Sequence, residues 1–88
     1  MLEIKSMRKK DAPNFCKWEA ETLTGEYLVI RYKDSSLDVR IARSHDEFVM
    51  GKHRAIYRNN INWQDSNNIP LDEVIEILGF DISKIDYY

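Results

Sequence analysis

Few residues in this sequence could carry out covalent or metal chemistry. Cys16 is the only cysteine, and His45 and His53 are the only histidines. A thiol needs a neighbouring base to become a strong nucleophile, and no histidine lies close to Cys16 in the sequence. The two histidines stand eight residues apart, which matches no common zinc spacing. We therefore expect no metal ion and no cofactor, and we interpret Cys16 as a small buried residue.

The remaining polar patterns do not predict catalysis. Gly51-Lys52 lacks the upstream glycine and the following hydroxyl residue of a phosphate-binding loop. Glu19 and Glu21 share one face of an expected strand, but Lys17 shares that face too, which is typical of a solvated ladder of charges. The sequence predicts a protein that is not an enzyme.

A different set of residues is suited to binding. Arg54, Tyr57 and Arg58 have the spacing i, i+3 and i+4, so on a helix they are neighbours. Arginine and aromatic side chains together form interface hot spots, and they also contact phosphates and bases. The candidate binding surface consists of Lys52, Arg54, Tyr57, Arg58 and Trp63. The alternative interpretation is a solvated basic face whose two aromatic rings lie at the edge of the core.

The charges are unevenly distributed along the chain. Residues 1–63 hold twelve Lys and Arg against nine Asp and Glu, whereas residues 64–88 hold one Lys against six Asp and Glu. Asp72, Glu73 and Glu76 form a candidate second surface, which is acidic. The two halves either neutralise each other or serve different partners.

These residues must be positioned by a sheet and two helices. Alternating apolar and charged residues predict three antiparallel strands, with one covered and one solvated face. The strands are expected at Phe15–Thr22, Glu26–Lys33 and Leu37–Ala42, and Met1–Ser6 is a candidate fourth strand at the edge. The first segment can also be interpreted as a short helix, Asn14–Glu21, after Pro13.

Two helices are expected to cover one face of this sheet. Ser44 and Glu47 fit a capping box, which predicts a helix from His45 to Arg58 with its basic side outward. Pro70 begins a second helix, and Gly79 ends it. The fold class is therefore α+β, in a single domain over residues 1–88.

Composition places this domain in a reducing compartment. A single cysteine cannot form an intramolecular disulfide, and no apolar run reaches the length of about 20 residues that spans a bilayer. We expect a cytoplasmic protein that does not enter a membrane. Its thin core and exposed edge strand are compatible with a homodimer.

Two resemblances bear on function. Leu71, Val74, Leu78, Gly79, Phe80 and Ile85 are similar to the first helix and turn of a helix-turn-helix, which would read DNA. Ile75 departs from that motif, because a small residue normally allows the two helices to cross. Asp81 and Asp86 depart from it as well, because phosphates would repel them.

The second resemblance covers about half of the chain. Trp18, Ala20, Thr22, Gly25 and Tyr27, followed by residues 44–58, resemble small proteins encoded by phages and prophages, with a β-meander and a capped helix. The resemblance implies an accessory factor or inhibitor that binds host machinery.

From these observations we expect a non-enzymatic module that binds a larger protein or a nucleoprotein complex. The alternative is a nucleic-acid-binding regulator that uses Arg31, Arg40, Arg54 and Arg58.

Overall fold

The computed structural model describes residues 3–80 and the backbone of residues 86–87. These residues form an antiparallel sheet of five strands, a sixth strand of two residues and two helices. The strands are β1 (Ile4–Lys10), β2 (Cys16–Thr22), β3 (Tyr27–Lys33), β4 (Ser36–Ala42), β5 (Arg54–Asn60) and β6 (Asp86–Tyr87). The helices are α1 (His45–Val49) and α2 (Leu71–Leu78). The α+β class is confirmed, but the sheet is larger than the three or four strands predicted.

Tight turns connect β2 to β3 and β3 to β4, whereas α1 lies between β4 and β5. The strand order is β5-β4-β3-β2-β1-β6, and only β6 runs parallel to its neighbour. Gly25, with φ of 89°, lies in the turn between β2 and β3. Asp34 and Ser35, with φ of 52° and 62°, join β3 to β4. Two successive positive φ angles are the geometry of a type I′ turn, which matches the twist of a hairpin.

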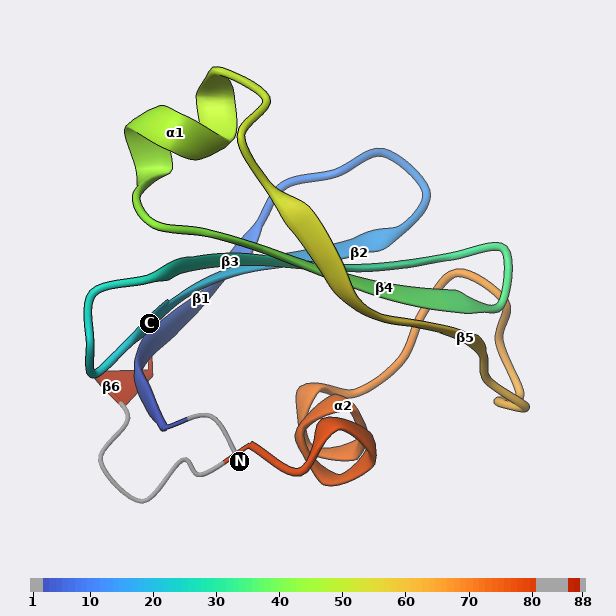
Figure 1. Cartoon of the computed structure of the whole chain (residues 1–88). Coiled ribbons are helices and arrows are strands. Elements are labelled where there is room, and N and C mark those ends of the chain that lie inside the picture. The colour runs from blue at the N-terminus through green and yellow to red at the C-terminus, as the bar shows by residue number, and fades with distance from the viewer. Residues whose placement is uncertain (1–2, 81–85, 88) are drawn as a thin grey trace.

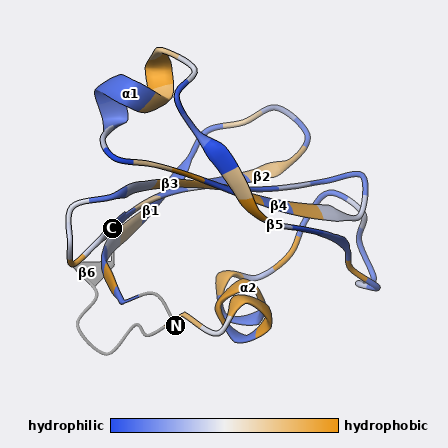
Figure 2. Cartoon of the chain, in the orientation of Figure 1, coloured by the Kyte–Doolittle hydropathy of each residue, from blue (hydrophilic) through white to orange (hydrophobic). Residues whose placement is uncertain are grey.

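One face of the sheet, the core face, carries the apolar rows. Leu28, Ile30 and Tyr32 of β3 are fully buried there, between the apolar rows of β2 and β4. Val74 of α2 is also fully buried and belongs to the same cluster. Figure 2 shows the apolar side of α2 turned toward the sheet and its polar side turned away. The opposite face, the outer face, carries the charged rows.

The two helices lie on opposite sides of the sheet, so the prediction that both cover one face is wrong. In Figure 1, α2 lies below the sheet, while α1 stands above one end of it. Phe48 of α1 contacts Tyr27 of the outer face edge-on, with ring centroids 5.3 Å apart. The outer face is therefore covered at one end and left open over the rest of the described chain.

The predicted helix from His45 to Arg58 is also wrong beyond its first turns. Its capping box is confirmed, because the Ser44 hydroxyl accepts a hydrogen bond of 3.2 Å from the Glu47 amide. The helix then ends, and Gly51 takes a positive φ of 82°. The following residues form β5 at the edge of the sheet. The prediction failed because a β-branched and aromatic segment gains more from pairing with β4 than from continuing past glycine.

The remaining element predictions have mixed outcomes. The alternative helix after Pro13 is wrong, since β2 begins at Cys16. The second helix is confirmed between Pro70, its N-cap, and Gly79, whose φ of 68° closes it. The end of the helix-turn-helix resemblance, residues 81–85, lies outside the described residues. No helix in the described part of the chain is long and apolar enough to cross a bilayer.

Candidate functional site

Strand β5 separates the residues that the sequence grouped on one helix. Tyr57 is half-buried and packs against the core. Arg58 pairs with Asp38 and is exposed on the outer face. Arg54 pairs with Ile41 of the core-facing row, so it projects toward the opposite side of the sheet. The single helical surface expected from the spacing is therefore not formed.

The other two predicted residues lie at the ends of this strand. Trp63 is half-buried and packs against the core, as the alternative interpretation of the sequence expected. Lys52 is exposed before β5, and it lines an open hollow together with Arg43, His53 and Arg54. Two glutamates line the same hollow, so its positive charge is partly offset.

Five charged side chains stand side by side across the outer face. The strand pairings place them in one line, from Lys10 through Lys17, Arg31 and Asp38 to Arg58. We call this line the cationic row. Each of the strands β1 to β5 contributes one residue, and four of the five are basic, which gives a formal charge of +3. At about 4.8 Å between strands, the row extends roughly 19 Å across the sheet.

The cationic row places like charges directly opposite each other. Lys17 pairs with Lys10 on one side and with Arg31 on the other. Like charges at opposed positions destabilise an antiparallel sheet, and each such contact costs on the order of a few tenths of a kcal/mol. This arrangement works against folding, so negative charge placed over the row would relieve the repulsion.

Asp38 is the single carboxylate in the row. Its Oδ2 accepts a hydrogen bond of 3.3 Å from Nε of Arg40, and the side chain is only 13% exposed. Its Oδ1 is buried and has no hydrogen-bond partner among the described residues. Arg31, Lys33, Arg40 and Arg58 line the hollow around this carboxylate, together with Asp34 and Ser36. The carboxylate therefore holds Arg40 in place and offsets one of four nearby positive charges.

An apolar hollow lies beside the row and shares several of its residues. Val29 lines it together with Phe15 and Phe48. His53 stacks on Phe48 with ring centroids 4.4 Å apart, and Nζ of Lys33 lies 5.4 Å from the centroid of the Phe15 ring. Three cations and one carboxylate line the same hollow, namely Lys17, Arg31, Arg40 and Asp38. Aromatic rings and cations thus meet on an open surface, which is the combination that binds unpaired bases.

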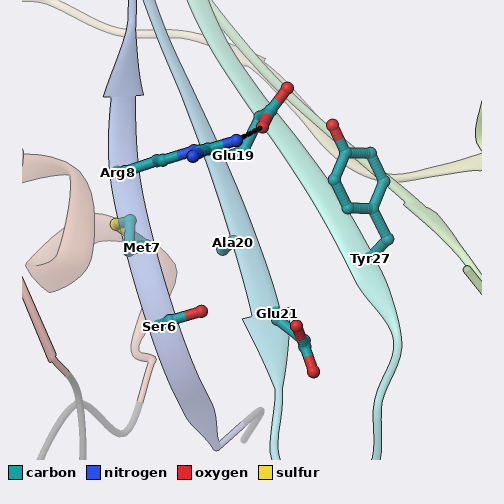
Figure 3. A pocket seen from close by; sticks show the side chains of 7 residues that line it. All are labelled: Ser6, Met7, Arg8, Glu19, Ala20, Glu21 and Tyr27. Carbon is teal, nitrogen blue, oxygen red and sulfur yellow. Dashed lines mark hydrogen bonds and ion pairs between the residues drawn. The ribbon is translucent and has the colours of Figure 1, made fainter. Parts of the chain in front are cut away.

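Beside the Lys10 end of the cationic row, charges on the outer face neutralise each other, and Nζ of Lys10 itself lies 4.0 Å from Oε2 of Glu19. Figure 3 shows Arg8 and Glu19 meeting over β1 and β2, with Nη2 of Arg8 3.3 Å from Oε2 of Glu19. Burial would raise the pKa of Glu19, but hydrogen bonds from Tyr27 and Arg8 and the charge of Lys10 outweigh it and lower the pKa below its ordinary value. Burial and the same carboxylate raise the pKa of Tyr27. The phenol therefore stays protonated and donates to Glu19, so this cluster is structural.

The acidic second surface lies on α2, away from the cationic row. Asp72 and Glu76 are exposed and Glu73 is half-buried. The ion pairs among the described residues all lie within residues 5–46, and none joins α2 to the basic part of the chain. The two oppositely charged regions therefore do not neutralise each other by direct ion pairs between described residues.

Cys16 is part of the core. It is buried, and its Sγ donates a hydrogen bond of 3.4 Å to Oδ1 of Asn68, which ties β2 to the loop before α2. Within residues 3–80, no group of three histidine, cysteine, aspartate or glutamate side chains could hold a metal ion.

Sequence reasoning identified parts of the cationic surface but not its layout. The sequence groups Arg31, Arg40, Arg54 and Arg58 as nucleic-acid contacts. The structure brings all of these except Arg54 around one hollow. Lys10 and Lys17 were missed, because only the register of β1 against β2 and β3 reveals that they continue the row. Counting residues back from each turn gives the register between paired strands, and this count could have identified Lys10 and Lys17 from the sequence.

Comparison of the chain with protein-family models, curated proteins and solved structures finds no match. The class is therefore defined by the fold and the site alone. The chain is a small α+β domain whose open sheet face carries a row of cations beside an aromatic hollow.

Proposed function

We propose that this protein is a non-enzymatic binding module that holds single-stranded nucleic acid on the outer face of its sheet. The observation that carries the proposal is the cationic row, in which Lys10, Lys17, Arg31 and Arg58 face the same side from four strands. A flexible polyanion can follow such a line and neutralise the repulsion within it. Phosphate contacts of this kind supply most of the affinity in sequence-independent binding.

The apolar hollow favours a single strand over a duplex. Base stacking on aromatic side chains requires exposed faces, which a single strand offers and a duplex does not. Phe15, Phe48 and His53 surround the hollow, within reach of the cations of the row. A duplex would normally be read by a helix in its major groove. The basic helix predicted from His45 to Arg58 is replaced beyond Gly51 by β5, and α2 carries acidic residues.

Fluorescence anisotropy with labelled single-stranded and duplex 12-mers tests this function. The row variant Lys17→Gln/Arg31→Gln/Arg58→Gln should lose at least tenfold in affinity for the single strand. Its slope of log affinity against log salt should fall by about 2, since each lost contact removes about 0.7. The matched control Lys9→Gln/Lys52→Gln/Arg54→Gln removes the same charge from outside the row and should keep most of the affinity.

Three results would contradict the proposal. One is an absence of binding at low salt, the second is equal loss in both variants, and the third is a preference for the duplex. Circular dichroism and thermal melting of each variant show whether a loss reflects unfolding.

A protein partner is the second candidate function, and the acidic surface of α2 supports it. Asp72 and Glu76 point away from the sheet and form no ion pair with the basic part of the described chain. An accessory or inhibitor protein of phage type, working in the cytoplasm as a monomer or homodimer, would bind a basic surface of a larger protein or nucleoprotein complex there. The variant Asp72→Asn/Glu73→Gln/Glu76→Gln should then lose a purified partner that wild type and the row variant both bind.

A further inference from the structure

The strand β5 presents an open edge to the outside of the sheet. It forms the end of the strand order, and within the described residues its ladder partner is β4 alone. Five of its seven residues are exposed, and the other two, Ile56 and Tyr57, are half-buried. An edge of this kind leaves alternate backbone N–H and C=O groups available for a further strand.

The hydrogen bonds at the end of the strand show which residues these are. The Ile61 amide donates to the Ser35 carbonyl over 2.8 Å, next to the pair formed by Asn60 and Ser36. In an antiparallel ladder, such a bond means that Asn60 belongs to a non-hydrogen-bonded pair. Alternation then places Arg58 in a pair of the same kind, and both residues turn their backbone groups outward.

The side chain of Asn59 supports this assignment. Its Oδ1 accepts a hydrogen bond of 3.0 Å from the exposed backbone amide of Asn60. If the Asn60 amide faced β4, it would donate to a carbonyl of β4 and would not be free to donate to Asn59. Asn59 thus acts as a local cap on the edge, and an incoming strand would replace it.

The charge around the edge defines the partner. Between Glu47 and Asp65 the sequence contains no acidic residue, while Lys52, Arg54 and Arg58 are exposed. A second copy of β5 would bring the same positive charges together, so self-pairing is disfavoured. A nucleic acid lacks the alternating backbone donors and acceptors that a ladder needs.

We infer that β5 binds an extended acidic segment of a partner protein by strand addition at Arg58 and Asn60. Main-chain hydrogen bonds would hold the segment, and carboxylates on its outer side would meet Arg58. This surface shares Arg58 with the cationic row and is otherwise separate from it. The module could then bind a nucleic acid and an acidic protein segment at the same time.

The test uses an end-blocked heptapeptide that alternates glutamate and valine, with a lysine–valine heptapeptide as its control. Amide hydrogen exchange by NMR is expected to show that the acidic peptide protects Arg58 and Asn60. The Tyr57 and Asn59 amides, which bond to β4, should be protected with or without it. Asn60→Pro removes the backbone N–H that faces outward and should weaken binding of the acidic peptide at least fivefold. Asn59→Ala removes the local cap and should strengthen binding.

Opposite effects of these two neighbouring substitutions are not expected from a change in stability alone. Equal binding of both peptides, or no protection at Arg58 and Asn60 at millimolar peptide, would overturn the inference. Concentration-dependent protection of these amides without any peptide would show self-association instead and would overturn it too. If Asn60→Pro fails to fold, Asn59→Ala still decides the matter. The row variant carrying Lys17→Gln and Arg31→Gln alone separates this inference from nucleic-acid binding, because it should keep the peptide and lose the oligonucleotide.

Discussion

Replacement of Lys17 by threonine should make the protein more stable and a poorer binder of nucleic acid. Lys17 stands directly between Lys10 and Arg31, so it takes part in both like-charge contacts of the cationic row. Removing it relieves two contacts of about 0.3 kcal/mol each, and threonine adds a small gain from its β propensity. The free energy of unfolding should rise by about 0.7 kcal/mol, which corresponds to about 3–5 °C in Tm for a domain of this size.

Urea unfolding and thermal melting at low ionic strength measure this gain. The gain in the free energy of unfolding should shrink in 1 M salt, where the Debye length is about 3 Å and the repulsion between the cations is screened. Lys33→Thr is the matched control. Lys33 lies on the same face but pairs with Ser36, and its ammonium sits over the Phe15 ring, so its loss should not stabilise the protein. A destabilised Lys17→Thr variant, or a gain that persists unchanged in salt, would refute the argument that like charges in the row repel each other and oppose folding.

Three further predictions concern single residues. Asp38→Asn removes the only negative charge of the row, so it should raise the affinity for a single-stranded oligonucleotide severalfold, as measured by fluorescence anisotropy. Unchanged or weaker binding would count against the role given to the row. Glu19 has a lowered pKa in the folded state, so its contribution to stability is present above its unfolded pKa of about 4.3 and is lost as the pH falls through the folded value. Wild type and Glu19→Gln should therefore differ in urea midpoint at pH 7 and converge as the pH falls below the lowered pKa of folded Glu19, and a constant difference would exclude this linkage. Gly51→Ala should lower the free energy of unfolding by about 1 kcal/mol, measured by thermal melting, because φ at this residue is 82° although the space around the site is open. A stabilised variant with more helix would show that the chain prefers the longer helix.

The elements that could be predicted were those whose signals are local. The hairpin between β3 and β4 follows from turn residues that accept positive φ between two alternating segments. The start of α1 follows from the Ser44 cap, and the end of α2 follows from Gly79. In each case the decisive interaction lies within a few residues of the chain, so no knowledge of the fold was needed.

The segment after Gly51 could not be assigned in this way, because its conformation depends on a distant partner. Residues 54–58 have a helical spacing of arginines, but Ile56 and Tyr57 also suit a strand. The free edge of β4 decides between the two, and that edge exists only once the hairpins have formed. The cationic row escaped prediction for the same reason, since it is a property of register between strands.

A β-bulge in β5 bears on both the wrongly predicted helix after Gly51 and the unpredicted cationic row. It also explains why the outer face is polar at β5. The pairing passes from Val39–Tyr57 to Arg40–Ala55, so Ile56 is an extra residue on β5. Without the bulge, strict alternation would place Ile56 on the outer face, directly beside Arg40. With it, Ile56 packs with the core, as Tyr57 does, and the small side chain of Ala55 pairs with Arg40 instead. The bulge thus keeps apolar bulk away from the hollow around Asp38 while Arg58 remains in line with the row, so one irregularity in the strand serves both the core and the proposed binding surface.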